Sequence, residues 1–410
     1  MEQDRRVQVE QVPSGALLIH AGMPKTGTTA LQRTAAARRA LLLEHGVRYP
    51  GRASNHRKAL FAFSSRPVSW AGPGASVPQR DHWDRLKAEL HRDDGRRLWL
   101  SNENLSDEPE DTLRSLLDEI GGPVFVVLTV RSLPAQLASA WQQYLKSGVW
   151  TSFESWLQRV LGDPPDPATT PSFAARLALG DVVDKWVRLV GQEHVLVVVL
   201  DPGDRALVPH TFEQLLDLPR GALEEDQLRG HHQNRSMTAP EAELVRRVNK
   251  AIRKRGDVPW RDYERFVRDG AVAAMLANRV PPPDEQRILP SRWAVERATA
   301  LAEEQIERIA ASQVRVVGSL EHLRTAVPAV ERASAAKSIP VDAAVEALLA
   351  VLSTGLGRGP SFGPPPLTSR PGKGQRVEDM PTASVARLLA HRVGQRVARI
   401  LPSAGGGKRD

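Results

Sequence analysis

Residues 17–32 of the chain read LLIHAGMPKTGTTALQ, and this stretch decides the fold. It begins in an apolar run, passes through a loop with two glycines and a lysine, and enters a segment rich in Ala and Leu with helical spacing. A buried strand that leads through a glycine-containing loop into a helix is typical of a parallel α/β sheet with crossover helices. The stretch therefore predicts a strand, a loop and a helix at the start of an α/β domain.

The loop itself has the composition of an anion site. Gly27 lets the backbone approach a ligand, and the helix that follows presents unpaired N–H groups at its positive end. Lys25 adds a full charge, and Thr28 and Thr29 add hydroxyl donors. The loop predicts a phosphate cradle, but the lysine precedes the second glycine, unlike the order G-x-x-x-x-G-K-[ST] of a Walker A loop.

The same alternation of short apolar runs and helical segments continues to about residue 220. Strands are expected at 16–21, 97–102, 124–130 and 195–200, and helices at about 28–45, 80–92, 109–119, 133–147, 152–161, 176–190 and 209–216. Residues 62–79 are rich in Pro, Gly and Ser and are expected to form a loop. Beyond residue 220 the strand-like runs stop, and helices are expected at 239–254, 262–278 and 292–314.

A second strand-to-helix segment follows about a hundred residues after the first. Residues 124–148 read VFVVLTVRSLPAQLASAWQQYLKSG, so that Arg131 ends the strand and Ser139 lies about two turns into the helix. Arg offers a bidentate fork to a phosphate, and Ser offers a short hydroxyl donor.

These two segments together resemble one enzyme family. Pro-Lys-Thr-Gly-Thr-Thr resembles the 5′-phosphosulfate loop of the sulfotransferases that use 3′-phosphoadenosine 5′-phosphosulfate (PAPS), and residues 20–32 look especially like its bacterial branch. The resemblance implies that PAPS is the sulfuryl donor, bound by Lys25, Thr26, Gly27, Thr28 and Thr29 at the 5′ end and by Arg131 and Ser139 at the 3′-phosphate. It also implies a P-loop NTPase-like parallel sheet flanked by helices, with a C-terminal helical addition.

A third segment, residues 233–249, resembles an Asn-Arg-Ser stretch of the bacterial members. On that interpretation Asn234, Arg235 and Ser236 close over the nucleotide. The segment is equally well explained as a helix-capping loop, because Thr238 and Glu241 form a capping signal.

Sulfuryl transfer needs charge stabilisation on the leaving phosphate and a base on the acceptor hydroxyl or amine. The resemblance gives the first role to Lys25. For the base the sequence offers His56, in a loop after the first helix, and Glu103, just past a strand end, and it does not choose between them.

The mechanism that the resemblance implies requires no metal. There is no cysteine, which excludes disulfides, thiolate zinc sites and cysteine nucleophiles. The adjacent His231 and His232 point in different directions and have no third ligand at useful spacing, so we interpret them as surface residues.

Charge and hydropathy limit the partners. The net charge is +8, but residues 371–410 hold eight Lys or Arg against three Asp or Glu, so the body of the chain is only mildly basic. Only 20 of 410 residues are aromatic, which argues against a nucleic-acid groove. No apolar run reaches the length of a membrane helix, and the N-terminus lacks a secretory signal, so a cytoplasmic location is expected.

The domain boundaries follow from these patterns. We expect a sulfotransferase domain at 14–330, with an α/β core at about 14–220 and a helical addition at about 221–330. A helical segment at 331–354, a disordered linker at 355–380 and a basic amphipathic tail at 381–410 follow. The apolar stripe of residues 383–401 suits either a peripheral contact with an anionic membrane, at its inner face, or docking onto the protein body.

The leading prediction is a PAPS-dependent sulfotransferase with a carbohydrate, lipid or small-molecule acceptor. The alternatives are a non-catalytic nucleotide-binding or membrane-recruited scaffold with a retained phosphate loop, and a P-loop kinase. The position of the lysine, and the absence of a plausible Walker B Asp at a strand end, argue against the kinase, since the strand at 124–130 ends in Arg instead. The acceptor and the oligomeric state are not predicted.

Overall fold

The computed structural model describes residues 9–67, 76–92, 94–162, 164, 166, 173, 177–224 and 235–357. The chain divides into two units, Met1–Phe362 and Gly363–Asp410, and the second unit lies outside the described residues. The expectations for the tail at 381–410, for most of the linker at 355–380, and for His231, His232 and Asn234 also fall outside them.

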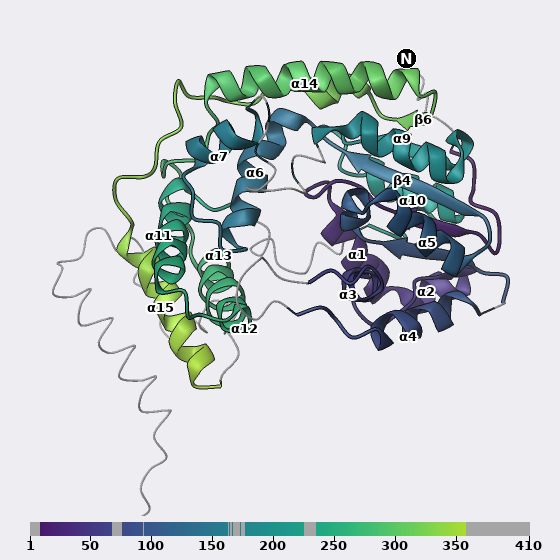
Figure 1. Ribbon diagram of the computed structural model, residues 1–410, viewed down its shortest axis with the longest axis horizontal. Helices are drawn as coiled ribbons and strands as arrows, with labels where there is room; N and C mark the ends of the chain where they lie inside the picture. Colours follow the sequence, from purple (N-terminus) through teal and green to yellow (C-terminus); the bar gives the residue numbers. More distant parts are fainter. Residues whose placement is uncertain are drawn as a thin grey trace, which may run out of the picture. The chain divides into compact units, whose positions relative to one another are not determined.

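Within the described residues the strands form one sheet in the order β2-β3-β1-β4-β5-β6, and every pairing is parallel (Figure 1). The strands are β1 (Leu17–His20), β2 (Val47–Arg48), β3 (Arg97–Ser101), β4 (Val124–Val130), β5 (Val195–Val199) and β6 (Arg315–Val317). The predicted α/β fold, a parallel sheet flanked by helices with a C-terminal helical addition, is confirmed. β1 lies between β3 and β4, so the predicted phosphate loop leaves the middle of the sheet at its carboxyl edge, where ligands bind in open α/β sheets.

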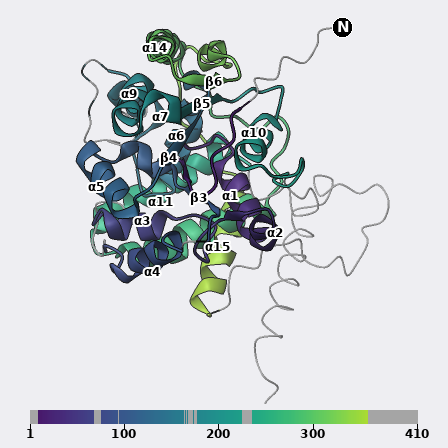
Figure 2. The ribbon, with the colours of Figure 1, turned by 90° about the vertical axis from the view of Figure 1, so that its right-hand side faces the viewer.

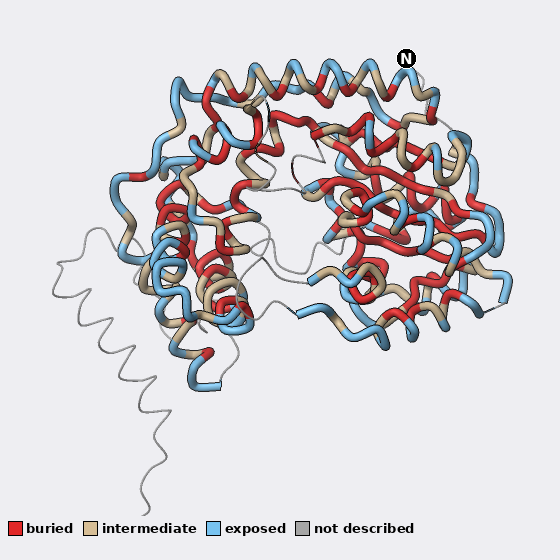
Figure 3. Tube along the Cα trace, in the orientation of Figure 1, coloured by how far each residue is buried: buried red, intermediate tan, exposed pale blue. Residues whose placement is uncertain are grey.

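Strand side chains alternate between two apolar clusters, one on each face of the sheet. In Figure 3 the strands of the sheet are coloured mostly as buried. Leu18 and Trp99 pack with α1 (Thr28–Ala37), α2 (Arg39–Glu44) and α10 (Leu207–Leu216). Leu17 and Ile19 belong to the cluster that includes α3 (Arg57–Phe63), α4 (Asp81–Leu90), α5 (Glu110–Ile120), α6 (Leu133–Leu145) and α9 (Leu179–Val190). Burial on both faces explains why the strands read as continuous apolar runs. Short 3₁₀ turns complete the connections: η1 (Glu103–Asp107), η2 (Gln192–His194) and η5 (Leu320–Arg324).

The helical region extends from α6. It contains α7 (Phe153–Val160), α11 (Ala239–Arg255), α12 (Trp260–Asp262), the π-helix η4 (Tyr263–Val272), α13 (Ala273–Asn278), α14 (Arg292–Ala311) and α15 (Val341–Gly355). α11 contacts α6, α14 contacts both α6 and α9, and α15 contacts η4 and α13 (Figures 1 and 2). The capping interpretation of Thr238 and Glu241 is confirmed, since these residues form a complete capping box at the start of α11.

Several expected boundaries are wrong, for local physical reasons. The predicted helix at 28–45 breaks at Arg38 into α1 and α2, and residues 331–340 precede α15 without forming a helix. The predicted loop at 62–79 begins inside α3, which ends at Phe63. The sheet is not complete at residue 220, because β6 pairs with β5. β2 and β6 are two and three residues long, too short for a hydrophobic period to reveal them.

Candidate functional site

The loop after β1 is held directly against β4. The Ala21 amide donates to Val127 O at 3.0 Å, and the Met23 amide donates to Thr129 O at 2.7 Å. A Cβ on Gly22 would lie 1.8 Å from Thr129 Oγ1 and 2.6 Å from the Thr129 amide nitrogen, so no side chain fits here. The loop can follow this path only because residue 22 is glycine.

The backbone of the loop has two left-handed residues, a feature that is common in anion-binding turns. Lys25 has φ 65° and Gly27 has φ 81°, so two residues of the loop are in the left-handed region. For a non-glycine residue such as Lys25 this conformation is uncommon and costs free energy. Gly27 is the N-cap of α1 and no side chain caps this helix end. Such turns direct successive N–H groups into a concave surface that suits anions.

Beneath the loop, a buried chain of hydrogen bonds fixes its shape. The Thr26 hydroxyl donates to Met23 O at 2.6 Å, so in its 2.8 Å contact with Thr129 it must accept. The Thr129 hydroxyl therefore donates to Thr26, and it accepts from His20 Nε2 at 3.1 Å. Thr26, predicted to bind the nucleotide, uses its side chain to hold the loop.

The chain continues through His20 to the neighbouring strand. With Nε2 carrying the proton, His20 Nδ1 accepts from the Ser101 hydroxyl at 2.9 Å. Burial lowers the pKa of His20 to about 3, which keeps the ring neutral. His20 thus joins the carboxyl ends of β3, β1 and β4. The sequence signal for it was a single polar residue at the end of an apolar strand.

Glu103 lies at the same edge, immediately after β3. Gln32, on α1, donates from Nε2 to Ser101 Oγ at 2.9 Å and to Glu103 Oε2 at 3.4 Å. The Glu103 carboxylate is half-buried in η1. Gln32 therefore connects this carboxylate to the helix that follows the phosphate loop.

His56, the other candidate base, is inside the protein. It is 4% exposed, its Nδ1 accepts from the Ser101 amide at 3.0 Å, and its Nε2 donates to Pro50 O at 2.9 Å. Burial lowers its pKa to about 4, despite its backbone hydrogen bonds. Both ring nitrogens are occupied, so the geometry favours Glu103 over His56 as a base.

The structure brings the two predicted phosphate-binding segments together. Arg131, half-buried at the end of β4, donates from Nη1 to Lys25 O at 2.9 Å. Ser139 lies on α6, where its hydroxyl donates to Gln136 O at 2.9 Å. Lys25 itself is exposed, yet partial desolvation and the Arg131 guanidinium lower its pKa.

A third cation, Lys146, lies close to these residues and was not predicted. It follows α6 directly and is half-buried, and burial together with the charges of Lys25 and Arg235 lowers its pKa to about 8. Lys25, Arg131 and Lys146, which we call the loop cations, have no ion pair with any acidic residue in the described part of the chain. No carboxylate of the described residues therefore compensates their charge.

Arg235 is arranged differently. Its guanidinium makes a bidentate ion pair with Glu241, at 2.7 Å from both oxygens, and also donates to the carbonyls of Leu276 and Met275. Since these contacts use its donors, the expectation that Arg235 closes over the nucleotide is not supported by its geometry. Ser236 is exposed beside it.

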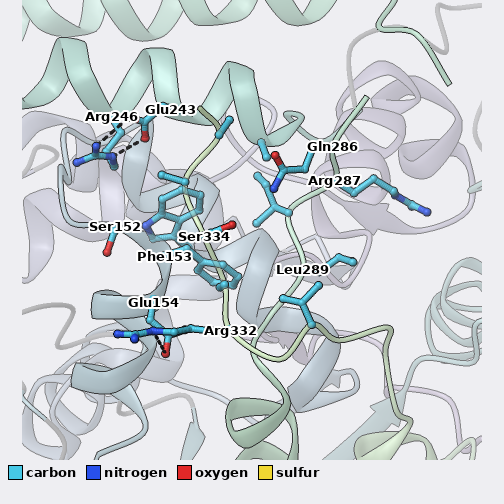
Figure 4. A pocket seen from close by; sticks show the side chains of 17 residues that line it. Ser152, Phe153, Glu154, Glu243, Arg246, Gln286, Arg287, Leu289, Arg332 and Ser334 are labelled. Atoms are coloured by element: carbon cyan, nitrogen blue, oxygen red, sulfur yellow. Dashed lines mark hydrogen bonds and ion pairs between the residues drawn. The ribbon is translucent and has the colours of Figure 1, made fainter. Parts of the chain in front are cut away.

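The hollow in Figure 4 is separate from this site. It is lined by Trp141, Phe153, Glu154, Glu243 and Arg246, among others. Trp141 is about 200° around α6 from Ser139, so the hollow lies on the opposite face of this helix from Ser139. Glu243 pairs with Arg246 at 2.7 Å, and Glu154 accepts from the Trp293 indole at 3.0 Å. Glu243 and Glu154 are therefore satisfied by partners in the protein.

Two further searches bear on the expected partners. Across the described ranges, no three His, Cys, Asp or Glu side chains form a group that could hold a metal ion. None of the described helices is both long and apolar enough to cross a membrane. The peripheral membrane contact through 383–401 stays a prediction.

Comparison with solved structures gives a distant similarity. The chain is similar to the crystal structure of a sulfotransferase from Alicyclobacillus acidocaldarius, with a TM-score of 0.37 and 15% sequence identity, over 62% of this chain and 100% of that chain. No family model and no curated protein matches the chain. A similarity this distant does not identify a reaction.

Proposed function

We propose that the chain is a sulfotransferase that moves a sulfuryl group from PAPS to a hydroxyl or amine of an acceptor. The observation that carries the proposal is the contact between Arg131 and the Lys25 carbonyl, at 2.9 Å. It joins the two sequence segments that separately resemble the 5′ and 3′ phosphate sites of this family.

The site fits a donor with a phosphosulfate and a second phosphate. The loop offers an uncapped helix end and left-handed residues at positions 25 and 27, and the three loop cations lack acidic partners among the described residues. A cluster of unpaired, partly desolvated cations is unfavourable by itself and becomes favourable when an anion binds.

Within this proposal each residue has one task. The N–H groups at the start of α1 and the hydroxyls of Thr28 and Thr29 bind the 5′ end of the donor, while Arg131 and Ser139 bind the 3′-phosphate. The Lys25 ammonium neutralises the charge that develops on the leaving phosphate oxygen. Gly22 and the buried chain through Thr129 and His20 keep the loop in place.

Glu103 accepts the proton of the acceptor nucleophile. Its carboxylate is positioned by Gln32, and it lies past the end of β3, the strand next to β1. The carboxyl ends of adjacent parallel strands lie at one edge of a sheet, which brings this base and the phosphate loop to the same edge.

A P-loop kinase is the nearest alternative. Asp201, which follows β5 after one residue, is the Asp to consider as a Walker B carboxylate. Asp201 Oδ1, however, accepts from the Gly203 amide at 2.7 Å in a local turn, and β4 separates β5 from β1. We therefore assign Asp201 to the turn.

Thermal unfolding with two nucleotides separates these alternatives. A sulfotransferase is stabilised by 3′-phosphoadenosine 5′-phosphate (PAP), by about 2.7 kcal/mol at a hundredfold excess over Kd. A kinase is stabilised by ATP with Mg²⁺ instead. Stabilisation by ATP with Mg²⁺ and not by PAP would overturn the proposal.

Transfer assays separate an enzyme from a scaffold. Labelled PAPS, incubated with a panel of carbohydrate, lipid and small-molecule acceptors, should give a labelled product with at least one class. Binding of PAP without transfer to any of them would favour the non-catalytic scaffold, with its retained phosphate loop.

A further inference from the structure

Lys146 occupies a defined place relative to the predicted 3′-phosphate site. It lies seven residues after Ser139, and seven residues are close to two helical turns, so both side chains leave α6 on the same side. Gln142 lies between them, and its Oε1 accepts from the Met237 amide at 2.7 Å. This face of α6 is therefore the one against which the segment before α11 is held.

The charged neighbours of Lys146 come from two other elements. Lys25 belongs to the loop after β1 and Arg235 to the segment before α11. Tyr263, on η4, donates its hydroxyl to Leu145 O at 3.1 Å, and its pKa is raised by burial, so it stays neutral. Arg235 is compensated by Glu241, whereas Lys146 has no carboxylate partner among the described residues.

A lysine at a helix end is commonly explained by the negative end of the helix dipole. The chain offers a matched case in Lys254, an exposed lysine in the last turn of α11. Lys254 faces solvent, and nothing about its surroundings points to a ligand. Lys146 differs because it is half-buried and placed beside a second unpaired cation, Lys25, which favours a bound anion over a dipole effect.

Resting on the proposed function, we propose that Lys146 is a third cation of the nucleotide site and binds the donor's phosphate groups together with Lys25 and Arg131. Only the protonated amine can do so. Since the pKa of Lys146 is lowered to about 8, its contribution is present below that pH and is lost as the pH rises above it. The enzyme then has an alkaline limit on nucleotide binding that lies well below the ordinary titration of lysine.

The test is the Kd of PAP by titration calorimetry at pH 7 and about pH 9.5. Lys146→Ala should weaken binding roughly 10- to 100-fold at pH 7, the scale of one charge-assisted hydrogen bond. Lys146→Arg should bind like the wild type at pH 7 and lose less affinity than the wild type at the higher pH, because its guanidinium stays charged while Lys25, whose pKa is also lowered, can still titrate. Lys254→Ala is the matched control and should leave both values unchanged.

The outcomes separate the two proposals. This inference is overturned if wild-type protein and Lys146→Ala bind PAP equally well. It is also overturned if Lys146→Arg loses as much affinity at high pH as the wild type does. In both cases the proposed function stands. If wild-type protein does not bind PAP at all, both are overturned. Circular dichroism shows whether the variants are folded. If Lys146→Ala does not fold, the comparison of Lys146→Arg with the wild type still tests the inference.

Discussion

Two clusters of basic side chains differ in how their charge is balanced. The loop cations Lys25, Arg131 and Lys146 have no acidic partner in the described part of the chain. In the other cluster, at the start of α11, Arg235 and Arg279 are paired with Glu241, and Arg279 also with Glu285 and Asp342.

The difference separates a binding role from a structural one. A buried cation with carboxylates on several sides is satisfied by the protein, and removing it leaves those carboxylates unpaired. Cations without carboxylate partners are typical of anion-binding sites, and removing them lowers the affinity for the ligand more than the stability of the fold. Residue type alone does not distinguish these cases, since each cluster contains an arginine from a segment that resembles the sulfotransferase family: Arg131 in one and Arg235 in the other.

The largest expected effect is on the paired cluster. The Arg279 side chain is 2% exposed and contacts Glu241 and Asp342 at 2.8 Å. Arg279→Ala should lower the free energy of unfolding by about 3 to 5 kcal/mol, because it strands buried carboxylates. Urea unfolding measures this. Arg292→Ala, an exposed arginine with a 3.5 Å contact to Glu331, is the control and should cost less than about 1 kcal/mol.

Arg131→Ala should act on the ligand. If Arg131 holds the 3′-phosphate, the variant should bind PAP more weakly by roughly 2 to 5 kcal/mol. Adenosine 5′-monophosphate lacks that phosphate and is the control, because loss of the contact with Lys25 O affects both nucleotides. An equal loss for the two would mean that Arg131 only supports the loop.

Lys25→Ala should lower kcat/KM for sulfuryl transfer by at least about two orders of magnitude, the scale of one pre-organised charge-stabilising group. The midpoint of thermal unfolding should hardly change, because the side chain is exposed and has no ion pair within the described residues. A variant that keeps most of its turnover would remove Lys25 from the chemistry.

The smallest effect concerns the neutral groups beneath the loop. His20 binds a proton readily when unfolded but only near pH 3 when folded, so stability falls as the pH decreases from about 6.5. His20→Asn should reduce that slope by up to about 1.4 kcal/mol per pH unit between pH 6.5 and 4.5. Urea unfolding at several pH values tests this, and an unchanged slope would mean that His20 is protonated in the folded protein.

The sequence by itself determined the local parts of the site. The period of apolar residues, set by neighbours along the chain, placed β1, β3, β4 and β5 within a residue or two. The order of Pro24, Lys25 and Gly27 indicated an anion loop, and the structure has left-handed backbone at two of these positions. The edge strands were missed because two or three residues carry no period.

Only the tertiary structure decided which side chains lie together at the candidate site. Ser101 lies beside His20 and Val124 beside Leu17 because of the parallel register, which depends on packing across more than eighty residues. That register buries His56, holds Gln32 near Glu103 and fixes the tautomer of His20. The packing of the helical region brings Arg279 to Glu241 and leaves Lys146 without a carboxylate partner among the described residues. Burial and charge compensation are properties of neighbours in space, and the order of residues along the chain does not specify them.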